Sequence, residues 1–85
     1  MFVRVVQREA WEVEVPGKAT RSFASEREAM AFARSLMPAW VEVGVVVPAR
    51  EGVPRHHRWT TLRRSQAGSY VVSGLRWGGR PTPGG

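Results

Sequence analysis

Hydrophobic and polar residues alternate along much of the chain. In WEVEV (11–15) the apolar side chains fall on one side of an extended backbone while Glu12 and Glu14 fall on the other, because successive side chains on a strand point to opposite faces. FVRVVQ (2–7) and WVEVGVVV (40–47) are rich in β-branched residues and are also predicted to be strands. The pattern indicates half-buried strands with one face turned to solvent.

A single helix is predicted over residues 26–37. Ser25 is placed to cap it and Glu28 to bond back to the cap, which is the arrangement of a capping box. Pro38 marks the end of the helix because proline cannot continue it. Apolar residues recur at helical spacing and form one stripe that should face the core: Ala29, Phe32, Ala33, Leu36 and Met37. We expect the larger side chains of this stripe, Phe32 and Leu36, to be buried against the sheet.

Three further strands complete the pattern. ATRSF (19–23) follows a Pro-Gly turn, and HRWTTLRR (57–64) forms a hairpin with YVVSG (70–74). The order βββαβββ predicts an α+β fold with one helix packed on a mostly antiparallel sheet. This single small domain should span residues 1–74, and the Gly/Pro/Arg-rich segment 75–85 should form a flexible C-terminal tail.

The composition argues against an enzyme. The chain has no Cys, and it also lacks Asp and Asn, so neither a Ser-His-Asp nor a Cys-His-Asn triad can be assembled. Glu12 and Glu14 share a face, but they lie on the outer side of a strand where no cleft is implied. His56 and His57 are adjacent, so on a strand they point to opposite faces and cannot chelate one ion. We expect no catalytic, cofactor or metal site.

No apolar run approaches the roughly 18 residues that a membrane span needs, and charges interrupt the first fifteen residues, unlike the apolar core of a signal peptide. We therefore expect a cytoplasmic protein with no membrane partner.

The net charge of +6 lies entirely in the C-terminal half of the chain. Residues 1–47 carry six cations and six glutamates, whereas residues 48–85 carry seven arginines and one glutamate. Such asymmetry indicates an anionic partner. That partner is either nucleic acid, DNA or RNA, or an acidic protein surface.

RHHRWTTLRR (55–64) concentrates this charge around an aromatic ring, a combination in which the ring stacks on a base while arginines hold phosphates. The segment after residue 74 repeats the theme. The residues expected to contact nucleic acid are Arg55, His57, Arg58, Trp59, Arg63, Arg64, Arg76, Trp77 and Arg80. Binding of this kind would be largely sequence-tolerant, and if the two tryptophans stack on bases, single strands should be preferred to duplex.

The segment 11–36 resembles the N-terminal arm-site-binding (AP2-like) domain of tyrosine recombinases. Both have a Trp-led strand, a short turn, a basic return strand ending in Phe, and an Ala/Phe-rich helix. The resemblance implies a three-stranded sheet that enters the DNA major groove and is backed by the helix. Lys18 and Arg21 match the basic positions of the hairpin, and the packing positions are matched by Phe23, Ala29 and Phe32.

Continued to about residue 52, the same segment is also similar to small bacterial proteins of unknown function with a strand–strand–helix–strand layout. Glu12 and Glu14 depart from the recombinase pattern, because they are acidic where a DNA-facing strand needs basic residues. The basic C-terminal half is therefore the better candidate for a DNA-binding surface.

The alternative function is a protein-interaction module, such as a phage or mobile-element inhibitor or adaptor. Its basic half would dock on an acidic protein surface. A strand as rich in Val as 41–47 could instead pair through a sheet edge with another protein, or with a second copy in a homodimer.

Overall fold

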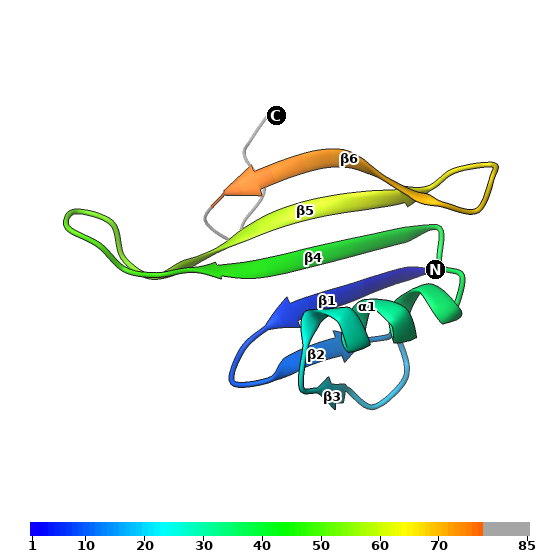
Figure 1. Ribbon diagram of the computed structural model, residues 1–85, viewed down its shortest axis with the longest axis horizontal. Coiled ribbons are helices and arrows are strands. Elements are labelled where there is room, and N and C mark those ends of the chain that lie inside the picture. Colours follow the sequence, from blue (N-terminus) through cyan, green and yellow to red (C-terminus); the bar gives the residue numbers. More distant parts are fainter. Residues whose placement is uncertain (78–85) are drawn as a thin grey trace.

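The chain folds into a six-stranded sheet with one helix (Figure 1). The computed structural model describes the backbone of residues 1–77 and the side chains of residues 1–74. The elements in chain order are β1 (Phe2–Gln7), β2 (Trp11–Glu14), β3 (Arg21–Phe23), α1 (Glu26–Ser35), β4 (Trp40–Val47), β5 (His56–Arg64) and β6 (Tyr70–Trp77). The predicted α+β class and the order βββαβββ are confirmed.

The strands lie in the order β3-β2-β1-β4-β5-β6. Four neighbouring pairs are antiparallel, and only β1 and β4 run parallel. The sheet therefore consists of two antiparallel units of three strands each, joined at the β1–β4 pair. The crossover between these two strands passes through α1, as a parallel connection requires.

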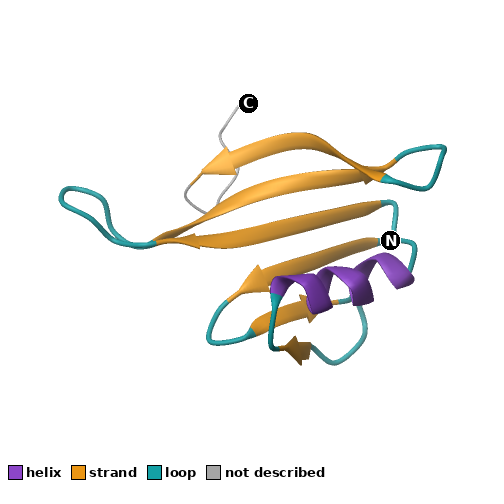
Figure 2. Cartoon of the chain, viewed as in Figure 1, coloured by secondary structure: helices purple, strands orange, loops and turns teal. Residues whose placement is uncertain are grey.

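The helix covers only one of these two units. It packs on β1, β2 and β3, and Figure 2 shows it lying over that half of the sheet. The core under the helix is built from small and β-branched side chains of α1, β1 and β2 and of the adjoining strand β4, which are fully buried: Val3, Val5, Val13, Ala29, Ala33 and Val41. Beyond α1, no other described element is stacked on the sheet, so the helix-side face of β5 and β6 lies beyond its cover. No helix within the described residues is long and apolar enough to cross a membrane.

The predicted start of the helix is confirmed in detail. The Ser25 hydroxyl accepts a hydrogen bond from the backbone N–H of Glu28 and donates one to the Glu28 carboxylate, each at 3.2 Å. The pair thus satisfies one of the backbone donors that a helix start leaves without a partner.

The predicted apolar stripe is correct only in part. Phe32 and Leu36 are half-buried, packed against the core but not enclosed by it. The prediction is wrong for Met37, whose side chain is 64% exposed. The helix ends at Ser35, and Met37 adopts a left-handed φ of 51°, which turns it away from the helix face that meets the sheet.

Strand β6 is longer than predicted. It continues to Trp77, because β5 is long enough to pair with it and places Arg58 opposite that residue. Residues 75–77, assigned from sequence to the flexible tail, therefore belong to the sheet, and residues 78–85 lie outside the described part of the chain.

Phe32→Ala should lower the free energy of unfolding by about 2 kcal/mol, less than the roughly 3–5 kcal/mol lost when a fully buried Phe is removed. The ring is half-buried, its centroid lies 5.4 Å from that of the tilted Phe23 ring, and the Arg21 guanidinium carbon lies 4.6 Å from the Phe32 centroid. Urea unfolding would measure the difference, with Thr20→Ala at an exposed position as the control. A variant that unfolds like the parent would show that the helix contributes little through this ring.

Candidate nucleic-acid interface

The predicted contact residues of β5 lie on two opposite faces of the sheet. Arg58 faces the same side as α1, where it lines a groove with residues of the helix. His57 and Trp59 lie on the other side, which we call the outer face, where Trp59 meets Arg4 of β1. The sequence-predicted set therefore does not form a single surface.

Trp59 is a packing residue, since only 8% of it is exposed. Its ring lies on Gly44 of β4, so closely that a Cβ added there would come within 2.5 Å of a ring carbon. The Arg4 guanidinium lies 5.2 Å from the ring centroid, and the ring of His57 lies 5.6 Å away. The Trp59 ring thus has no exposed face on which a base could stack. In the sequence, Gly44 within the Val-rich stretch 40–47 was the signal that another group approaches this strand closely.

Arg64 also has a structural contact. Its Nη1 donates to the carbonyl of Met37 at 2.6 Å, and its backbone N–H donates to the carbonyl of Ala39 at 3.0 Å. These bonds tie the end of β5 to the connection between α1 and β4. Arg55 and Arg63 are exposed.

The two histidines bond to separate backbone carbonyls. His57 Nε2 donates to the carbonyl of Gln7 at 2.8 Å, and His56 Nδ1 donates to that of Pro54 at 2.9 Å. Because a carbonyl oxygen only accepts, each of these ring nitrogens carries a proton. Both imidazoles are thereby fixed to the fold at positions that do not converge.

The remaining predicted residues lie at the end of the chain. Register places Arg76 opposite Trp59 and Trp77 opposite Arg58 in the β5–β6 ladder. The side chains of these two residues, and all of Arg80, lie outside the described part of the structure.

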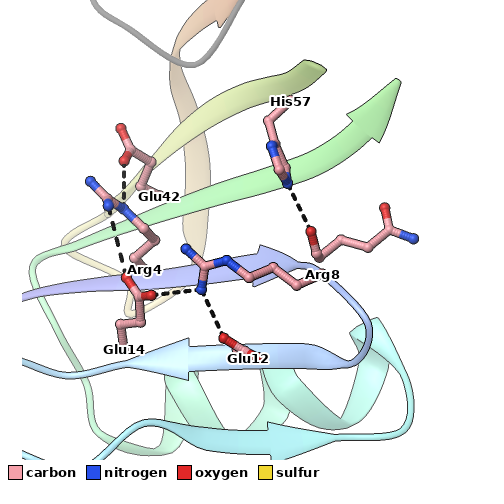
Figure 3. Close-up of polar contacts among 7 residues, drawn as sticks. Arg4, Arg8, Glu12, Glu14, Glu42 and His57 are labelled. Carbon is pink, nitrogen blue, oxygen red and sulfur yellow. Dashed lines mark hydrogen bonds and ion pairs between the residues drawn. The ribbon is translucent and has the colours of Figure 1, made fainter. Parts of the chain in front are cut away.

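A network of ion pairs covers the outer face over β1, β2 and β4 (Figure 3). Arg4 bridges Glu42 at 3.1 Å and Glu14 at 3.8 Å. Arg8 bridges Glu12 at 2.7 Å and Glu14 at 2.8 Å. Two arginines thus neutralise most of the charge of three glutamates, and this part of the outer face offers little attraction to a polyanion.

The contacts of Arg8 also fix its protonation. Hydrogen bonds to Glu14 and Glu12 raise the pKa of the Arg8 guanidinium above its ordinary value. Arg8 therefore stays positively charged throughout the accessible pH range.

The opposite face carries a groove between α1 and β4–β5, with a volume of about 620 Å³. Its sheet side is formed by Val43 and Val45 of β4 and by Thr60 and Leu62 of β5, and its helix side includes Met30 and Ala31. The groove exists because the helix stops short of β5, so these side chains lie beside the helix instead of under it.

Charge along this groove is predominantly positive. Arg27 and Arg34 of α1 and Arg58 of β5 line it, against one carboxylate, that of Glu26. All three arginines are exposed, and no side chain among residues 1–74 forms an ion pair with Arg27 or Arg34. The sequence did contain a signal for this pair, since residues seven apart lie on nearly the same side of a helix.

No family model, no curated protein and no solved structure matches this chain. The resemblance of residues 11–36 to the arm-site-binding domain thus stays a prediction. The candidate function rests on the arrangement of charges and apolar surface in this molecule.

Gly44→Ala should destabilise the fold by about 1–3 kcal/mol, because the added methyl group would force the Trp59 ring off the sheet. Thermal and urea unfolding would measure the loss. Gly74→Ala in β6 is the matched control, since a Cβ at that glycine meets no atom within 4 Å. Equal stability of the two variants would contradict the close packing of Trp59 on Gly44.

Proposed function

We propose that this protein binds nucleic acid, largely without sequence preference, through the groove between α1 and β4–β5. The observation that carries the proposal is the division of charge between the two faces of the sheet. Arg4 and Arg8 of the outer face are held by glutamates, whereas Arg27 and Arg34 of the groove form no ion pair with any side chain among residues 1–74.

The groove suits an extended polyanion because its cations stand on two sides. Arg27 and Arg34 are about 10 Å apart along the helix axis, and Arg58 stands across the groove on β5. A guanidinium group can hold a phosphate through two parallel hydrogen bonds. The apolar floor supplies contact area for sugars and bases without selecting among bases, which fits sequence-tolerant binding.

This site keeps part of the surface predicted from the sequence. Arg58 belongs to both, and Arg27 and Arg34 are added from the helix. In this site the floor of the groove contacts the bases. Trp59 does not, because its ring is buried.

Replacing Arg27, Arg34 and Arg58 together by Gln should weaken binding about tenfold or more. The slope of log affinity against log salt should fall by about 0.9 for each arginine that contacts a phosphate of duplex DNA. Fluorescence anisotropy at several salt concentrations, with labelled duplex DNA, single-stranded DNA and RNA of equal length, would measure both quantities.

The matched control replaces Lys18, Arg50 and Arg55 by Gln, three exposed basic residues that do not line the groove. It removes the same charge, so a groove-specific site predicts a much smaller loss. Equal losses in the two triple variants would reduce the interaction to net charge. Absence of binding by the parent at low salt would overturn the proposal and favour an acidic protein as the partner.

Trp77→Ala should lower single-strand affinity by about 1–3 kcal/mol if this residue stacks on a base. Register places it opposite Arg58, one of the groove arginines. Because Trp77 belongs to β6, the substitution can also destabilise the sheet, so the melting temperature of the variant protein must be measured as well. Trp77→Phe, which keeps an aromatic ring at the same position, is the control and should retain most of the affinity. Unchanged affinity of a folded Trp77→Ala variant would exclude stacking by this ring.

A further inference from the structure

The outer face is covered by ion-paired side chains over β1, β2 and β4 but is open at one end. Val6 is 1% exposed and Trp59 is 8% exposed there, since the layer of Arg4, Arg8 and their glutamates lies over β1, β2 and β4. The next row of residues toward the start of β1 has no such cover.

This uncovered row crosses four strands. Phe2 of β1 lies beside Trp40 of β4, Trp40 lies opposite Arg63 of β5, and Arg63 lies opposite Val71 of β6. Phe2 is 42% exposed, Trp40 37% and Val71 42%. We call these four residues the end row. Large exposed apolar side chains grouped around an arginine have the composition of a protein interface core.

We propose that the end row is the centre of a two-fold symmetric dimer, in which the outer faces of two copies of this chain pack against each other. A second copy fits because the row is self-complementary. An aromatic ring, that of Trp40, stands next to a cation, that of Arg63, so a two-fold axis between them brings each ring over the other copy's guanidinium. An acidic partner would satisfy Arg63 but would leave Phe2, Trp40 and Val71 without an apolar counterpart.

Charge makes this dimer distinguishable from nucleic-acid binding. Each copy carries a net charge of +6, so the two copies repel each other, and salt screens that repulsion. Dimerisation should therefore strengthen as salt rises, whereas binding to a polyanion weakens. The two equilibria respond to salt with opposite signs.

If the proposed function also holds, the dimer has a functional consequence. The two outer faces meet in the interface, so the helix-side grooves point away from each other. One dimer could then hold two separate nucleic-acid segments. This consequence rests on the proposed function, but the interface itself does not.

Sedimentation equilibrium of the full chain without nucleic acid, at low and high salt, tests the interface directly. The parent should show a monomer–dimer equilibrium that shifts toward dimer at high salt. Val71→Gln and Arg63→Gln should each raise the dimer dissociation constant about tenfold, because a two-fold interface loses the contact twice. Arg63→Lys, which keeps the cation, should recover part of that loss.

Val72→Gln is the matched control. Val72 is the next residue on the same strand and is 65% exposed, but it points to the opposite face of the sheet. The proposal requires dimerisation to survive this change.

A parent that stays monomeric at all concentrations and salts would overturn the dimer, as would equal effects of the two valine substitutions. A dimer without nucleic-acid affinity would leave the interface standing and remove the proposed function. Nucleic-acid binding by a strict monomer would support the proposed function and overturn the dimer.

Discussion

One ten-residue helix must serve a six-stranded sheet, and the rest of the structure follows from that mismatch. A helix with its side chains is about 10–12 Å wide, whereas neighbouring strands lie about 4.8 Å apart, so it covers two or three strands. Here it covers β1, β2 and β3. Strands β5 and β6 must gain stability from strand pairing and from contacts among their own side chains. A groove forms beside the helix, where its cover of the sheet ends.

On the outer face, where no helix packs, charged side chains cover the apolar residues instead. Trp59 lies on Gly44, and the Arg4 guanidinium lies over its ring, so a basic residue serves as the outermost layer of a small apolar cluster. Long charged side chains can cover apolar surface while their heads remain hydrated. Glu42, 3% exposed and bonded to Arg4, completes this layer. Because Arg4 is paired with Glu42 and Glu14, it contributes little net attraction for an anion.

Local pattern was enough to predict the elements but not their surroundings. Alternation identified the strands, and the Ser25–Glu28 box located the start of the helix, because both signals act between near neighbours. The extension of β6 to Trp77 depends on the length of β5, and the exposure of Met37 depends on a left-handed turn. The sequence marked Gly44 as a point of close approach and placed Arg27 and Arg34 on one side of the helix. It did not show which face of β5 the helix covers, because topology decides that.

The parallel β1–β4 pair has a consequence for how the chain reaches this structure. Within each three-stranded unit, partners are joined by short connections, but Val3 pairs with Val41 across the whole of β2, β3 and α1. Closing a loop of that length costs entropy before any contact compensates for it. We therefore expect the two units to assemble as local hairpins and the pairing of β1 with β4 to be the step that limits folding. Mutations along β1 and β4 should act on the folding rate, while those in the β5–β6 hairpin should act mainly on unfolding.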